Sequence, residues 1–252
     1  MSGHSKWATT KHRKGAQDAK RSALFGKLSR QITVAAKEGG DPNPDNNAAL
    51  AAAIAKAKSY SLPNSNIESA IKNAFGRDEN AANFESIAYE GYGPAGIAVY
   101  VECLTDNRNR TAADVRSAFT HSGGNLGTSG SVAFQFDKKG EITVEKSDDL
   151  DEDSLMMAVA EAGGEDYEDN EETWAVWTDP TELMAVSKAL EAQGVKVKGA
   201  ELTMIPNTPV SVDVADAKKV LRLVDKLEDL DDVQNVYHTM ELSDEVLAAL
   251  DE

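Results

Sequence analysis

The sequence predicts an α+β fold, in which an N-terminal three-helix domain is followed by two domains where strands and helices alternate. Three observations support this prediction. Apolar residues recur at helical spacing up to about residue 78, and they alternate as in strands after residue 84. Clusters of Gly, Pro, Asn and Asp separate these stretches. A chain of 252 residues, 41% of them hydrophobic, can bury the cores of two or three domains.

The N-terminal domain, residues 1–78, is predicted to contain three helices. The first begins near Lys11 and ends at a Gly-Gly pair, and its apolar face carries Leu24, Phe25, Leu28, Ile32 and Ala35. The second is rich in Ala, begins near Asn47 and stops before Pro63. The third begins at a capping box formed by Ser65 and Glu68, and a glycine ends it.

After a polar stretch the spacing of apolar residues becomes that of strands. Ser86–Glu90 is a predicted strand, and a Gly- and Pro-rich turn separates it from a second strand at 97–104. A helix through 112–119 follows, and then a strand at Val132–Asp137. The last three elements form one βαβ unit.

The region 138–205 contains a complete series of elements. They are a strand at 142–146, a helix at 154–162, a strand near 167, a strand at 173–178, a helix at 180–193 and a strand at 195–203. The helix at 180–193 is expected to begin with Asp179 as cap and Pro180 in its first turn. The order βαββαβ predicts an acidic ferredoxin-like domain.

A further βαβ unit follows, with a strand at 210–212, a helix at 215–230 and a strand at 233–237. Joined to the earlier βαβ unit, it forms the same arrangement again. We therefore expect a second ferredoxin-like domain, made of residues 84–137 and 206–242 and split by insertion of the first. Residues 243–252 are expected to form a helical tail. Three independent units are disfavoured, because a lone βαβ unit cannot cover both faces of its sheet.

The charge of the chain is distributed unevenly. The segment Gly3–Lys37 carries nine bases and one acid, a net charge of +8, whereas the whole chain carries −17. The other 17 bases and 42 acids therefore give −25. Clustered Lys and Arg release condensed counterions when they neutralise phosphates, so this segment is predicted to bind a phosphate backbone.

The basic segment supplies most of the candidate contacts. A run of Lys and Arg on a helix is often only its solvated side, and this alternative stays open. Here, however, Trp7 and His12 are interleaved with the bases, as suits phosphate contact combined with base stacking. The predicted nucleic-acid contacts are Lys6, Trp7, Lys11, His12, Arg13, Lys14, Lys20, Arg21, Lys27 and Arg30. The motifs of sequence-specific readers do not occur.

A second group of candidate contacts precedes the helix at 112–119. Its members are Arg108, Asn109 and Arg110. Thr111 is expected to cap that helix, and a helix N-terminus beside two arginines suits a phosphate. Equally, the arginines could pair with acids and only fix the turn. The acids considered are Glu90, Glu102 and Asp114.

The sequence offers little support for catalysis or metal binding. Cys103 is the only cysteine, which excludes an internal disulfide and thiolate zinc sites, and its strand position predicts a core residue. The four histidines lack metal-ligand spacing, and no nucleophile–base pattern stands out. The loop 123–131 follows a helix and lacks the lysine of a P-loop, so it is interpreted as a turn. We expect no catalytic residue, metal or cofactor.

Several ordered motifs resemble the YebC/PmpR family. They are residues 3–7 (GHSKW), 11–14 (KHRK), 89–94 (YEGYGP), 105–111 (TDNRNRT), 123–127 (GGNLG) and 227–234 (LEDLDDVQ). The resemblance covers nearly the whole chain and implies a three-domain cytoplasmic protein that regulates transcription by binding DNA. Relatives include mitochondrial translational activators of cytochrome c oxidase, and other members act on the ribosome. Departures at Thr9-Thr10 and at 62–66 are mild.

These observations favour a non-enzymatic nucleic-acid-binding regulator in the reducing cytosol, with no membrane partner because no apolar run reaches roughly 18 residues. The alternative is a ribosome-docking translation factor whose basic end meets ribosomal RNA. An enzyme that uses the Arg108–Arg110 loop on a phosphorylated substrate is the weakest hypothesis. The acidic domain should be repelled by phosphates, so it is expected to face a protein partner or the ribosome.

Overall fold

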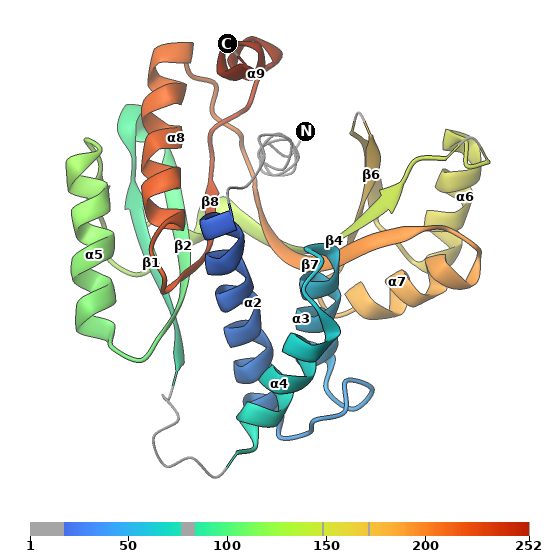
Figure 1. Ribbon diagram of the computed structural model, residues 1–252. Helices are drawn as coiled ribbons and strands as arrows, with labels where there is room; N and C mark the ends of the chain where they lie inside the picture. Colours follow the sequence, from blue (N-terminus) through green and yellow to red (C-terminus); the bar gives the residue numbers. More distant parts are fainter. Residues whose placement is uncertain (1–17, 77–83, 148, 171, 252) are drawn as a thin grey trace. The chain divides into compact units, whose positions relative to one another are not determined.

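The computed structural model describes residues 18–76, 84–147, 149–170 and 172–251. Within these ranges the chain forms helices and two four-stranded sheets, as the predicted α+β fold requires (Figure 1). The described residues divide into two compact units. One contains 84–137 and 204–251, and the other contains 18–76 with 138–203.

Three helices open the second of these units, as predicted. They are α2 (Asp18–Gly39), α3 (Ala48–Ser59) and α4 (Asn64–Ala74). Their shared core contains Leu28, Ile32, Ala36, Leu50, Ala57, Leu62, Ile67 and Ala70. Asn47 caps α3, because its side chain accepts a hydrogen bond from the backbone N–H of Leu50 at 3.1 Å. Thr33 ties α2 to α4 by donating to the carbonyl of Ala70 at 3.0 Å.

The predicted start of α4 is wrong by a short distance. The helix begins at Asn64, and Pro63 stands in the cap position without a side-chain hydrogen bond to the helix. Proline fixes its own backbone angle, so the turn into the helix needs no capping side chain. Ser65 therefore lies inside the first turn and forms no capping box with Glu68.

The inserted region forms the predicted ferredoxin-like arrangement. Its elements are β4 (Phe136–Glu145), α6 (Glu152–Ala162), β5 (Asp166–Asp169), β6 (Thr173–Thr178), α7 (Leu183–Ala192) and β7 (Val197–Pro206). The strands lie in the order β5-β6-β4-β7, which is the order that a βαββαβ chain takes when it doubles over. The helix α7 begins later than predicted, because Thr181 closes a turn on Asp179 by donating its N–H at 2.8 Å.

Side chains of the inserted region contact side chains of the three helices. Ala52 and Ala55 of α3 pack against the core that contains Leu155, Leu183 and Leu190. Lys56 on the same helix forms an ion pair with Glu201 of β7 at 2.8 Å. The two regions that the charge pattern sets apart, one basic and one acidic, therefore meet within one compact unit.

The other unit contains a second sheet with helices on one face. Its strands are β1 (Glu85–Tyr92), β2 (Ala98–Thr105), β3 (Asn125–Leu126) and β8 (Val233–His238), in the order β3-β1-β2-β8. Its helices are α5 (Arg108–His121), α8 (Val214–Glu228) and the C-terminal α9 (Asp244–Asp251), with short 3-10 turns at Pro94–Gly96 and Ala133–Gln135.

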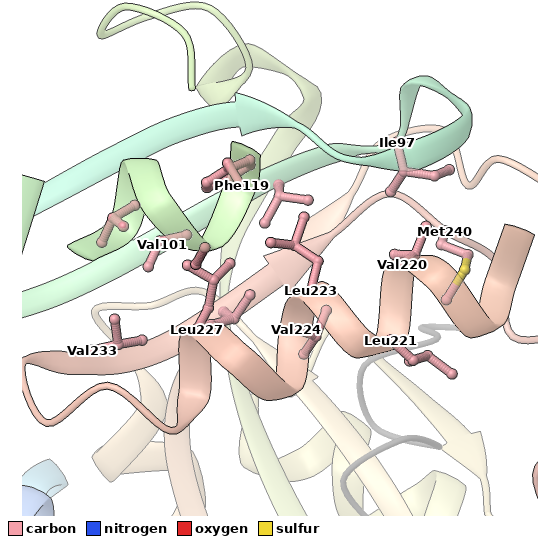
Figure 2. Close-up of a cluster of buried hydrophobic side chains, with 14 of the residues drawn as sticks. Ile97, Val101, Phe119, Val220, Leu221, Leu223, Val224, Leu227, Val233 and Met240 are labelled. Atoms are coloured by element: carbon pink, nitrogen blue, oxygen red, sulfur yellow. The ribbon is translucent and has the colours of Figure 1, made fainter. Parts of the chain in front are cut away.

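Helices α5 and α8 cover the core of this sheet. Figure 2 shows Leu223 and Leu227 of α8 beside Phe119 of α5 and Val101 of β2, and Phe119, Leu223, Leu227 and Val101 are fully buried. Burying side chains of this size contributes about 1.5–3 kcal/mol each. The cluster also includes Cys103, a core residue as predicted.

Two predicted strands of this unit are wrong. The predicted strand Val132–Asp137 contains instead a 3-10 turn at Ala133–Gln135, and its last two residues begin β4, which belongs to the other sheet. Val132 and Phe136 are buried against Ala98 and Tyr237 on the sheet face away from α5 and α8, which explains their strand-like alternation. At 210–212 only Val210 forms a bridge, to Met240. The β1–β2 hairpin, antiparallel along its whole length, instead occupies the centre of the sheet.

Candidate nucleic-acid interface

Helix α2 carries the described part of the basic segment. Leu28, Ile32 and Ala36 are buried at intervals of four residues, so the opposite side of the helix faces outward. The described side chains of α2 include the bases Arg21, Lys27, Arg30 and Lys37 and one acid, Glu38. Arg21 and Lys37 are exposed, whereas Lys27 and Arg30 are half-buried, and Lys27, Arg30 and Lys37 each make a contact of their own.

Several predicted contacts lie outside the described residues. They are Lys6, Trp7, Lys11, His12, Arg13 and Lys14. Lys20 lies within α2, but its side chain is not described. The structure therefore brings together Arg21, Lys27 and Arg30 on one helix, and the role of all ten residues stays a prediction.

A hollow opens between α2 and α4. It has a volume of about 430 Å³ and is lined by Arg21, Ser22, Phe25, Gly26, Ser29 and Asn66. The guanidinium carbon of Arg21 lies 5.3 Å from the centre of the Phe25 ring, within cation–π range. Sequence reasoning treated Phe25 only as a core residue and missed the hollow. Gly26, in the interior of a predicted helix, was the signal that could have indicated it.

The second group of candidates forms the first turn of α5. The helix begins at Arg108, and Asn107 caps it by accepting a hydrogen bond from the N–H of Arg110 at 3.1 Å. The predicted cap, Thr111, is wrong, because that residue is already one turn inside the helix and is buried. Asn and Asp are better caps than Thr, so the earlier Asn prevails.

Arg110 is held by carboxylates of its own fold. Its guanidinium donates to Asp106 at 2.8 Å and to Asp232 at 2.7 Å. The hydrogen bonds to Asp232 and Asp106 raise the pKa of Arg110, which stays charged. Arg108 lies 3.7 Å from Glu85, and both side chains are largely exposed. The arginines do pair with acids, but not with Glu90, Glu102 or Asp114.

Asp232 is the centre of a buried polar network. The same Oδ2 atom also accepts a hydrogen bond from the hydroxyl of Thr111 at 2.8 Å and lies 3.3 Å from that of Thr105. Both threonines are buried, and the side chain of Asp232 is 9% exposed. The carboxylate of Asp232, in the turn before β8, thus holds together β2 and the first turn of α5. We infer that the first turn of α5 has a structural role.

Glu90 has a different structural role. It is buried on β1, and its carboxylate accepts hydrogen bonds from the N–H groups of Gly130, Val132 and Ala133 at 2.7–2.8 Å. Burial by itself would raise the pKa of Glu90, but the three backbone donors outweigh it and hold the pKa below its usual value. The loop 123–131 therefore folds around a protein carboxylate, and β3 lies within it.

The acidic residues of the inserted domain are partly matched by its own lysines. Lys139 pairs with Glu165 at 2.6 Å, and Lys146 pairs with Asp169 while lying 4.4 Å from the centre of the Trp174 ring. Two methionines of α6, Met156 and Met157, are exposed beside acidic residues of the same helix.

Among the described residues, no group of three or more His, Cys, Asp or Glu side chains could hold a metal ion. Within the same described residues, no helix has the length and apolar character needed to cross a membrane.

Comparison with known proteins gives matches along nearly the whole chain. Residues 5–77 match the model of the TACO1/YebC protein N-terminal domain, and residues 84–240 match that of the TACO1/YebC second and third domain. A crystal structure of a conserved hypothetical protein from Aquifex aeolicus superposes with a TM-score of 0.79 at 44% identity, covering 89% of this chain and 91% of that one.

Curated relatives match over their full length. A protein named "Probable transcriptional regulatory protein" from Rubrobacter xylanophilus is 52% identical over 248 residues, which is 98% of each chain. A protein of the same name from Bifidobacterium animalis subsp. lactis is 52% identical over 252 residues, 100% of each chain. The chain therefore belongs to the TACO1/YebC family.

Proposed function

We propose that this protein is a non-enzymatic, cytoplasmic nucleic-acid-binding regulator of gene expression, and a DNA-binding transcriptional regulator as the names of its relatives suggest. The observation that carries the proposal is the concentration of positive charge on α2 and the segment before it, in a chain of net charge −17. Such a surface attracts a polyanion, while the acidic remainder keeps clear of it.

The contacts act mainly on the phosphate backbone. Arg21, exposed near the start of α2, supplies a described part of the charge, together with the predicted contacts before residue 18. Arg108 and Asn109 add a second candidate contact, and Arg110 contributes less because Asp106 and Asp232 hold its guanidinium. About six phosphate contacts would cost roughly a thousandfold or more in affinity between about 50 and 200 mM salt.

One observation favours RNA over duplex DNA. The hollow beside Arg21 combines a cation, an aromatic ring and amide and hydroxyl groups, which suits an unstacked base. The alternative function is therefore a ribosome-associated translation factor that binds ribosomal RNA. In either case we propose that the acidic inserted domain contacts the ribosome or another protein.

The proposal is tested in the full-length chain by replacing Lys11, Arg13, Lys14 and Arg21 with Gln. Deletion of residues 1–37 would be ambiguous, because Leu28 and Ile32 belong to the core. We expect at least a tenfold loss of affinity for DNA and RNA at about 100 mM salt. The slope of log K against log salt should become shallower by about 0.9 for each duplex phosphate that the variant no longer neutralises.

A matched control removes the same charge elsewhere. Lys188, Lys196, Lys198 and Lys218 are exposed lysines outside the basic segment, and their replacement by Gln should leave affinity within twofold. Equal binding by the test variant and the unaltered chain would contradict the proposal. Co-sedimentation with ribosomes in competition with duplex DNA then separates the two functions.

A further inference from the structure

We propose that the hollow between α2 and α4 binds one unpaired nucleotide, whose base lies against the helix backbone at Gly26. The inference rests on the proposed function, since it names the form of nucleic acid that the basic segment holds. It goes further in predicting that single strands, and not duplexes, place a base in this hollow.

Gly26 stands in the interior of α2, where glycine costs roughly 0.5–1 kcal/mol relative to alanine. Glycine in such a place usually allows a positive φ or a close approach of neighbouring atoms. Neither applies here. Gly26 is not among the glycines of positive φ, and no described atom lies within 4 Å of the position that a Cβ atom would take.

Gly91, unlike Gly26, is a glycine that close packing requires. A Cβ atom at Gly91 would lie 2.6 Å from the carbonyl oxygen of Asn125 and 2.7 Å from the ring of Phe119, so the β1–β3 pairing excludes a side chain there. Gly26 instead faces the open hollow. This open space would let a ligand approach the backbone of Gly26 closely.

The lining of the hollow has the chemistry of a nucleotide site. Phe25 is half-buried and offers its ring to a base, and the guanidinium of Arg21 can bind the attached phosphate. The amide of Asn66 offers both a donor and an acceptor, and Ser22 and Ser29 add hydroxyl groups.

The base must be unpaired because of the contacts that the hollow offers. Stacking against the Arg21–Phe25 pair and hydrogen bonding to the amide of Asn66 both need a base whose face and edge are free. A base in a duplex is stacked on its neighbours and paired along its edge, so it has neither a free face nor a free edge to insert. Strong positive charge in the segment favours a nucleotide over an uncharged planar ligand.

The test fills the hollow without removing a charge. Gly26→Ala and Gly26→Leu are compared with the unaltered chain for binding to a single-stranded RNA, a single-stranded DNA and a duplex DNA, each of twelve nucleotides per strand. Both residues are better helix formers than glycine, so the melting temperature should rise. We expect single-strand affinity to fall severalfold for Ala and at least tenfold for Leu, with duplex affinity within twofold.

The control is Asn73→Ala in α4. Asn73 is exposed, does not line the hollow, and its replacement also favours the helix. We expect single-strand binding within twofold of the unaltered chain. This control separates a loss of space from a change in helix stability.

The results separate the two proposals. Unchanged single-strand binding by both Gly26 variants overturns the inference alone, and so does an equal loss on single strands and duplex. Absence of any nucleic-acid binding by the unaltered chain overturns the proposed function with it. A loss confined to RNA, or shared by both single strands, supports the site and identifies which sugar it accepts. Should Gly26→Leu fail to fold, Gly26→Ala decides the matter by itself.

Discussion

Two helices that carry arginines, α2 and α5, differ in where their charge is used. In the first turn of α5, Arg110 is held between two carboxylates, and one of them, Asp232, is buried together with two threonine hydroxyls. On α2, Arg21 is exposed, and the contact described for its guanidinium is the ring of Phe25. Arg110 therefore stabilises the fold, whereas Arg21 borders the hollow between α2 and α4.

The contrast extends to the carboxylates of the unit that contains β1 and β8. Glu90 and Asp232 are both buried and both accept several hydrogen bonds from groups that the fold has already placed. Charges of this kind stabilise the protein only while every partner remains. Charges on an outer helix face contribute little to stability and act on other molecules at a distance. Residue type alone does not distinguish these two uses.

Loss of the central carboxylate should have the largest effect. Asp232→Ala leaves the buried hydroxyl of Thr111 and the guanidinium of Arg110 without a shared acceptor. We expect a loss of about 3 kcal/mol in the free energy of unfolding, measured by urea denaturation. Asp114→Ala is the control, because Asp114 is exposed on α5, the helix of Thr111 and Arg110, and it should change stability by less than about 0.5 kcal/mol. Similar losses in the free energy of unfolding for both variants would show that the hydrogen bonds of Asp232 do not stabilise the fold.

Glu90 should make stability depend on pH. Because its folded pKa lies below the usual value, its contribution is present above the unfolded pKa of about 4.5 and is lost as pH falls through the folded pKa. Glu90→Gln should lower the free energy of unfolding by about 2 kcal/mol at pH 7. The amide NH2 group of Gln would replace a carboxylate oxygen, and it cannot accept hydrogen bonds from the backbone N–H groups. The stability of this variant should also vary less than that of the unaltered chain below pH 4.5. Parallel pH profiles would contradict this explanation.

The sequence predicts most of the fold because most of its helices and strands have the matching period. It fails at Val132 and Phe136, whose alternation arises from packing on the second face of the sheet and not from a place within it. It also fails at β3, because two residues are too short to show any period. The predicted order of strands in the split domain was therefore wrong at two places, the expected strand at 132–137 and the unexpected β3.

The candidate site was predictable as a charged segment but not in its geometry. Nine bases in the first 37 residues indicate a partner, whereas nothing local to Arg110 shows that Asp232, 122 residues later, will hold it. The hollow likewise needs Asn66 of α4 beside Gly26 of α2. Contacts between residues so far apart in the chain follow only from the folded structure.

Exchanging the two arginines for glutamine should have opposite consequences. Arg110→Gln should lower the melting temperature, by less than Asp232→Ala does, and leave nucleic-acid affinity within twofold, because its guanidinium is already engaged. Arg21→Gln should leave the melting temperature unchanged and lower affinity severalfold. Thermal melts and binding curves at one salt concentration check both. The comparison is wrong if Arg110→Gln is the variant that loses affinity.

The smallest effect on stability is expected at Arg108. It approaches Glu85 at 3.7 Å, but the two side chains are 62% and 50% exposed, so water screens the pair. Arg108→Ala should therefore change the free energy of unfolding by no more than about 0.5 kcal/mol. Its affinity for nucleic acid is the informative measurement. A severalfold loss would show that the first turn of α5 contacts phosphate through Arg108 while Arg110 fixes the turn, whereas unchanged affinity would confine the interface to α2 and the segment before it.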